Sequence, residues 1–301
     1  MTMTITQPIR YIALDFDNCI CEINDAFRIV WDFYENLILH PELSEHWHQL
    51  GELWISELDK ALSDGKLHFL NDDVMMLLKH VHHGDLEVKP EVFVYTNNTN
   101  EELIRFLGSV IEKNMRLKPW SRAFFAQDPR RAHEFSAALA SDEPGKSFEG
   151  MKVCMGNPDD MTPETLIFLD DLLHPIRKTL GDHYIHIQPP FKSKDKFLPY
   201  VETLFKAIQN LERTISIENT IELRIHLRTY LHSKSSHLTY FPAPRDMYRE
   251  WNLQQWNDFY ALFQPFGAYE EDEKEEEEKK PLDAYYKCRD LLTRMQDASA
   301  S

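Results

Sequence analysis

The sequence predicts an α/β protein whose core is a parallel β-sheet with helices on both faces. Short, continuously apolar runs recur along the first 200 residues, as expected for strands that are covered on both sides. Longer segments with apolar residues at helical spacing lie between these runs, so strands and helices alternate. Ligands bind such sheets at the carboxyl ends of the strands, so a functional site is expected among the residues that end each run.

The expected elements can be placed in chain order. The apolar runs predict strands over 11–14, 92–95, 123–125, 165–169 and 184–187. Helical spacing marks 24–83, the stretch NEELIRFLGSVIEK, 197–269 and 281–301. The acidic run EEDEKEEEEKK at 270–280 has no apolar residue to bury, so it is expected to be a solvated linker or a charged helix surface.

Composition excludes several classes of protein. The 301 residues carry 33 basic and 50 acidic side chains, a formal charge of −17. A surface this negative repels phosphate backbones, so no long nucleic acid is expected as a partner. No apolar run approaches the roughly 18 residues of a membrane span, and the start MTMTITQPIR does not read as a secretory signal. Four cysteines form no disulfide framework, which indicates a reducing, cytoplasmic location.

Polar residues at the strand ends suggest a site for phosphoryl transfer. Asp15 and Asp17 follow the first strand, and alternation in an extended segment places them on one side. Thr96 ends the second strand, and Asp170 and Asp171 follow the fourth. Carboxylates from neighbouring strand ends suit a hard divalent ion, most plausibly Mg²⁺. A carboxylate can attack phosphorus, and a second can act as the general acid and base.

Four sequence motifs in this order resemble the haloacid dehalogenase-like (HAD) hydrolase superfamily. They are IALDFDNCI, VFVYTNNT, a lysine, and TLIFLDDL, and the resemblance covers about residues 9–190. It implies a Rossmann-like catalytic core and, because the second aspartate is present, the phosphatase branch. The lysine is assigned to Lys152; the alternative Lys146 follows Pro144 and Gly145 in what reads as a loop.

The resemblance also implies a role for each matching residue. Asp15 would be the nucleophile and a metal ligand, and Asp17 the general acid/base that also binds the metal through its backbone carbonyl. Thr96 and Asn97 would contact the phosphoryl group, and Lys152 would offset its charge. Of the acidic pair, Asp171 is favoured as the metal ligand and Asp170 as the partner of the lysine.

The chain departs from the family pattern at Cys19, where threonine or valine is frequent; a small buried thiol is expected to substitute. Arg130 and Arg131 have two possible roles, contact with a second phosphate of the substrate or a place on the surface. The aromatic segment 241–266 is expected to pack against the main domain, with partner binding as the alternative.

In the family, an insertion between the first two motifs forms a cap that closes over the site. The expected regions are a core of 1–23 and 86–200, a helical cap of 24–85, a helical extension of 201–269, the acidic linker 270–280, and a C-terminal helix and tail of 281–301.

The sequence as a whole predicts a Mg²⁺-dependent phosphomonoester hydrolase that forms an aspartyl-phosphate. A small phosphorylated metabolite is the expected substrate. The alternatives are a nucleotide end-phosphatase and a non-catalytic HAD-like binding or scaffold protein.

Overall fold

A computed structural model of the chain describes residues 7–22, 25–132, 134, 145–188, 197–234 and 283–293. The expectations for 241–266 and 270–280 lie outside these residues. The described residues form two compact units. A sheet unit takes those within 1–23, 68–192 and 279–301, and a helical unit takes those within 24–67 and 193–278.

The sheet unit has a Rossmann-like α/β fold. Its five strands are all parallel, in the order β3-β2-β1-β4-β5. They are β1 (Tyr11–Leu14), β2 (Glu91–Tyr95), β3 (Arg122–Phe124), β4 (Leu166–Asp170) and β5 (Tyr184–His186). This confirms the predicted fold class, with strand ends displaced by at most one residue. Every residue of β1 and β4 is buried, as continuous apolar runs predict.

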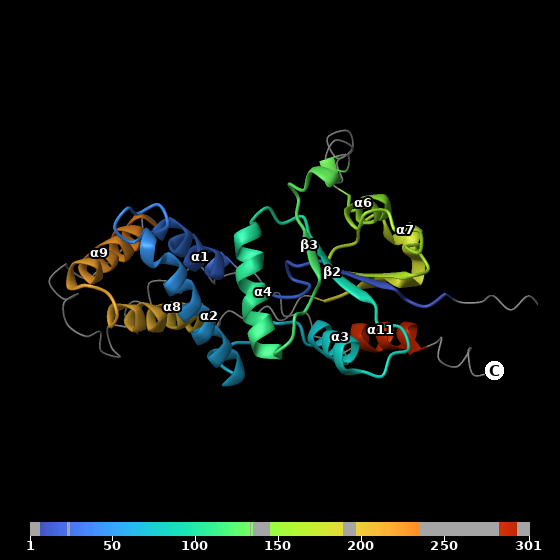
Figure 1. Cartoon of the computed structure of the whole chain (residues 1–301), viewed down its shortest axis with the longest axis horizontal. Helices are drawn as coiled ribbons and strands as arrows, with labels where there is room; N and C mark the ends of the chain where they lie inside the picture. The colour runs from blue at the N-terminus through green and yellow to red at the C-terminus, as the bar shows by residue number, and fades with distance from the viewer. Residues whose placement is uncertain are drawn as a thin grey trace, which may run out of the picture. The chain divides into compact units, whose positions relative to one another are not determined.

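Helices cover the strands in two groups (Figure 1). The helices of the unit are α3 (Asp72–His83), α4 (Glu101–Met115), α6 (Phe148–Cys154), α7 (Arg177–Leu180) and α11 (Asp283–Thr293), with the short helices η2 (Pro129–Arg131) and η3 (Gly181–His183). Met151 of α6 and Leu180 of α7 share a core with Ala13 and Phe93 of the sheet. On another flank, α11 packs against α3 and β5. The predicted C-terminal helix is therefore confirmed, and it belongs to the sheet unit.

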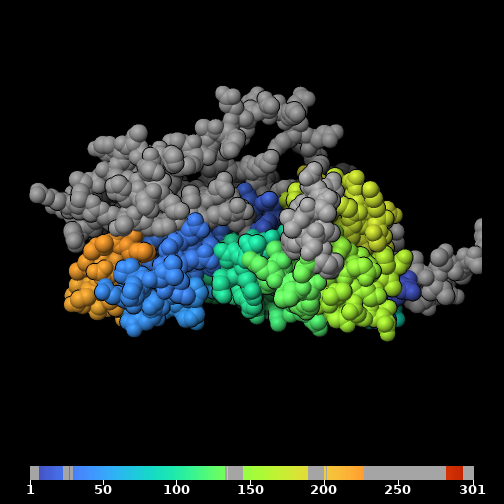
Figure 2. Space-filling model, turned by 90° about the horizontal axis from the view of Figure 1, so that it is seen from above, coloured from blue at the N-terminus to red at the C-terminus, as the bar shows by residue number. Residues whose placement is uncertain are grey.

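The helical unit is built from two distant stretches of chain. It comprises α1 (Asp25–Leu37), η1 (Ser44–His46), α2 (Trp47–Ser63), α8 (Phe197–Glu212) and α9 (Ile217–Lys234). Aromatic side chains fill its interior, and the buried Trp54 indole donates a 3.0 Å hydrogen bond to Thr203. Figure 2 shows the blue and orange surfaces of these two stretches side by side.

These units correct the predicted domain boundaries. The expected cap of 24–85 is divided, because α3 belongs to the sheet unit and only residues up to 67 belong to the helical unit. The expected extension 201–269 is not separate either, because α8 and α9 share a unit with α1 and α2. Helical spacing shows which face of a helix is apolar but not which element covers it. Among the described residues, no helix has the length and hydrophobicity needed to cross a membrane.

Candidate functional site

The register of the sheet brings three strand ends to one edge. Leu14 of β1 pairs with Val94 of β2 on one side and Leu169 of β4 on the other. One residue beyond Leu14, β1 and β4 are still joined by a hydrogen bond, because the N–H of Asp15 donates to the Leu169 carbonyl at 2.9 Å. The polar residues at these ends are Asp15, Thr96 and Asp170. The predicted convergence of polar strand ends is therefore present.

Three carboxylates gather at this edge. Asp15, Asp170 and Asp171 each offer an oxygen, and these oxygens lie within 4.8 Å of one another. Asp15 and Asp170 are buried, and Asp171 is half-buried. Burial, together with the charges of Asp15 and Asp170, raises the pKa of Asp171 to about 6. The group therefore has an excess of negative charge that a cation can offset.

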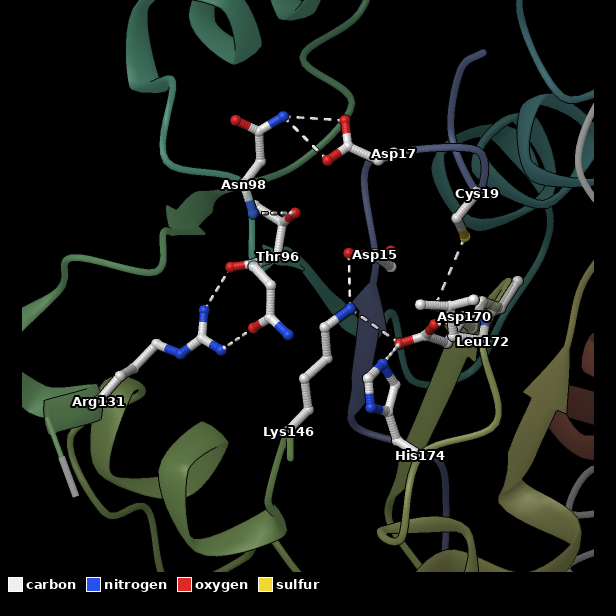
Figure 3. Close-up of polar contacts among 12 residues, drawn as sticks. Asp15, Asp17, Cys19, Thr96, Asn98, Arg131, Lys146, Asp170, Leu172 and His174 are labelled. Atoms are coloured by element: carbon white, nitrogen blue, oxygen red, sulfur yellow. Dashed lines mark hydrogen bonds and ion pairs between the residues drawn. The ribbon is translucent and has the colours of Figure 1, made fainter. Parts of the chain in front are cut away.

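Lys146 supplies one positive charge to this cluster (Figure 3). Its ammonium lies 2.6 Å from Asp15 Oδ1 and 2.8 Å from Asp170 Oδ2. The lysine is 3% exposed, so it is as buried as its partners. Burial alone would lower the pKa of Lys146, but the two carboxylates outweigh burial and raise it. The lysine thus stays charged.

This geometry corrects the assignment of the lysine to Lys152. A helix that precedes a parallel strand runs antiparallel to it, so the start of α6 lies near the carboxyl end of β4. Lys146 lies just before α6, whereas Lys152 lies in its last turn. At a rise of 1.5 Å per residue, Lys152 lies about 6 Å along the helix from its first residue, Phe148. The position of Lys146 in the loop before α6 counted against it in the sequence, but this position is what places its ammonium at the site.

Asp170 is held by further contacts that sequence reasoning missed. Its Oδ1 accepts a 2.8 Å hydrogen bond from the Leu172 N–H, and His174 Nε2 lies 3.5 Å from its Oδ2. Burial lowers the pKa of His174, so the imidazole is neutral at pH 7. The only signal for His174 in the sequence is its place four residues after Asp170. With both oxygens engaged, Asp170 fits the predicted role as partner of the lysine, and Asp171 is left as the freer ligand.

The Asp17 side chain lies apart from the three clustered carboxylates and contacts the segment that follows β2. Both of its carboxylate oxygens accept from the Asn98 amide at 2.9 Å, so the side chain turns toward β2 (Figure 3). The cluster of three carboxylates does not include it. The extended chain ends directly after Asp17: Asn18 has a φ of 58°, and the Ile20 N–H returns to the Phe16 carbonyl.

Thr96 and Asn97 lie at the end of β2. Thr96 is buried, and its hydroxyl oxygen accepts a 3.1 Å hydrogen bond from the Asn98 N–H. The Asn97 side-chain oxygen accepts from Arg131 at 2.6 Å. Helix α4 begins just beyond, where the Asn100 side chain accepts from the Leu103 N–H. Donors at a helix start favour a nearby anion.

The remaining candidates are structural. Cys19 is buried, and its thiol donates to the Leu169 carbonyl at 3.4 Å, which confirms the expected burial. Arg131 is fully buried, so neither the surface role nor the second-phosphate role describes it. Arg130 is half-exposed and pairs with Asp128 at 2.5 Å.

Comparison with known proteins found no protein that is significantly similar to this chain. No protein-family model matches this chain, and no curated protein or solved structure is significantly similar to it. The chemistry of the site therefore has to be argued from the carboxylates, the lysine and the threonine themselves.

Proposed function

We propose that this protein is a Mg²⁺-dependent phosphomonoester hydrolase of HAD type that acts through an aspartyl-phosphate on Asp15. The observation that carries the proposal is the placement of Asp15, Lys146, Asp170 and Asp171 at one edge of a parallel sheet. The four motifs that resemble the HAD superfamily support the same function, with Lys146 in place of Lys152.

The donor set fits a hard divalent ion. Oxygen ligands of this kind suit Mg²⁺, and a cation held there would offset the like charges that help to raise the pKa of Asp170 and of Asp171. Asp170 already accepts from Lys146 and Leu172, so Asp15 and Asp171 are the residues that would hold the ion. Mg²⁺ bound there would offset charge on the transferring phosphoryl group.

The chain's own residues divide the reaction into two displacements. An Asp15 oxygen attacks phosphorus, the bond to the leaving oxygen breaks, and Asp17 gives that oxygen a proton. Asp17 then takes a proton from water as the water attacks the aspartyl-phosphate, which releases inorganic phosphate and restores Asp15. Thr96 and Lys146 offset charge on the phosphoryl oxygens.

The acidic composition favours a small phosphorylated metabolite as substrate over a long nucleic acid. A panel of phosphorylated metabolites, with nucleoside monophosphates included, identifies the substrate class. Release of phosphate from nucleotides alone would favour a nucleotide phosphatase instead.

The decisive experiment is hydrolysis of p-nitrophenyl phosphate with and without Mg²⁺. Asp15→Asn is expected to abolish turnover because it removes the nucleophile, and the matched control Asp182→Asn, at an exposed acid of the same unit, is expected to retain it. Mass spectrometry of acid-quenched enzyme should find the phosphoryl adduct only when Asp15 is intact. Full activity in Asp15→Asn would reject this mechanism, and an inactive, folded wild type across the whole panel would favour a non-catalytic binding protein.

A further inference from the structure

A buried guanidinium is connected to the end of β2. Arg131 is fully buried, and two of its nitrogens donate to the Thr96 carbonyl and to the Asn97 side-chain oxygen. Its guanidinium carbon lies 4.0 Å from the centre of the Tyr95 ring. These contacts fix three consecutive residues of the chain, among them the threonine expected to bind phosphate.

The partner of this arginine leads to the lysine of the site. Glu134 Oε2 accepts from Arg131 Nε at 3.0 Å. Its other oxygen accepts from both the backbone N–H and the hydroxyl of Ser147, at 2.7 and 2.6 Å. Ser147 follows Lys146 directly and caps α6 through a 3.0 Å hydrogen bond from the Gly150 N–H. A continuous set of buried polar contacts therefore connects the β2 end with the segment that carries Lys146.

The packing around this connection is close enough to require glycine. A Cβ atom on Gly150 would lie 2.2 Å from Glu134 Oε1 and 2.4 Å from the Tyr95 hydroxyl. Helix α6 thus approaches the pair to a distance that no side chain permits. This observation is independent of the hydrogen bonds and shows that the position of Glu134 is defined by its surroundings.

Stability alone is a poor explanation for such an arrangement. A buried ion pair is expensive to desolvate, and apolar residues of similar volume are frequently as stable or more so. What a planar, multiply bonded guanidinium provides is fixed geometry. Both ends of this pair are bonded to segments that carry phosphate-binding candidates.

We propose that Arg131 and Glu134 form a positioning pair that sets Thr96 and Asn97 in register with Lys146. The contacts of Arg131 and Glu134 described above go to the β2 end and to Ser147, so the pair acts through the two segments it joins. The inference rests on the proposed function for its effect on turnover, while its structural half stands on the contacts alone.

The test replaces the pair with apolar side chains of similar length, Arg131→Met together with Glu134→Met. The matched control replaces the neighbouring pair of a half-exposed arginine and its aspartate, Arg130→Met together with Asp128→Asn. The apolar double variant is expected to fold but to lose roughly tenfold to a hundredfold in kcat, with a smaller change in KM, because the phosphate-binding groups are no longer held together. The control should keep the wild-type kcat.

Hydrogen exchange at the Ser147 amide separates this inference from the proposed function. The amide should exchange faster in the apolar variant than in the control, even if the wild type hydrolyses no phosphate ester. Should the apolar variant not fold, Glu134→Gln, which is nearly isosteric, takes its place with the same two readouts. A folded variant with unchanged Ser147 exchange, or with wild-type kcat in an active protein, would overturn the inference.

Discussion

Replacement of Lys146 by methionine tests the placement of the positive charge most directly. Methionine keeps most of the side-chain volume and removes the ammonium that lies 2.6 and 2.8 Å from two buried carboxylates. Removing one partner of a buried ion pair costs about 3–5 kcal/mol, because the remaining charge has no compensation. The unfolding free energy of a native protein is about 5–15 kcal/mol, so this loss is a large fraction of the total. Lys146→Met should therefore lose several kcal/mol of unfolding free energy near neutral pH.

Lys152→Met is the matched control. This lysine is half-buried in the last turn of α6, away from the cluster, and its replacement should change the unfolding free energy by less than about 1 kcal/mol. The assay measures the unfolding free energy by urea denaturation in metal-free buffer at several pH values. Circular dichroism monitors the unfolding. The loss in Lys146→Met should shrink toward about pH 4.5, because burial raises the pKa of both Asp170 and Asp171, and neutral carboxyls need no partner. A loss no larger than that of the control at neutral pH would refute the assignment of Lys146.

Two further predictions follow from the same region. The pKa of Asp171 is about 6 in the fold against an ordinary 3.8, so its contribution to stability is present below that ordinary value and is lost as pH rises through about 6. Mg²⁺ should therefore raise the melting temperature more at about pH 7.5 than at about pH 5, and Asp171→Asn should remove this difference in a thermal scan. Gly150→Ala should cost about 1–3 kcal/mol in urea denaturation, because its Cβ meets Glu134 and Tyr95, whereas Glu149→Ala on the exposed face should cost less than about 0.5 kcal/mol. Equal losses in these two variants would contradict the close packing.

The strands and their polar ends were predictable because the signal is local. A strand buried on both faces needs an uninterrupted apolar run, and the run at 166–169 is interrupted by Asp170 at the edge where ligands bind. The same reasoning located Asp15 and Thr96. It required no knowledge of which strands are neighbours, since the carboxyl ends of parallel strands lie on one edge.

The lysine and the Arg131–Glu134 pair depend on the path of the chain between strands. The direction of α6 favours Lys146, because a residue just before this helix lies at the carboxyl edge of the sheet, but this direction depends on where the helix begins. Arg131 and Glu134 are three residues apart, a spacing that also describes exposed helix pairs. Only burial distinguishes the two cases, and burial depends on contacts with Asn97 and Ser147 that are distant in sequence.

The division into two units was not predictable for a related reason. Segments 24–67 and 197–269 each show helical spacing, and nothing in either segment specifies the other as its partner. Contacts such as that between Trp54 and Thr203 join residues about 150 positions apart.

Helix α11 gives the sheet unit a property that concerns its synthesis. The Tyr285 N–H donates to Asp73 at 2.8 Å, and His80 meets the Tyr285 ring edge to face, so α3 obtains its covering from a segment made some 200 residues later. While the ribosome still holds that segment, the nascent unit has all five strands but an open apolar flank on α3. Its final closure must follow translation of residue 293 and cannot accompany the emergence of the sheet.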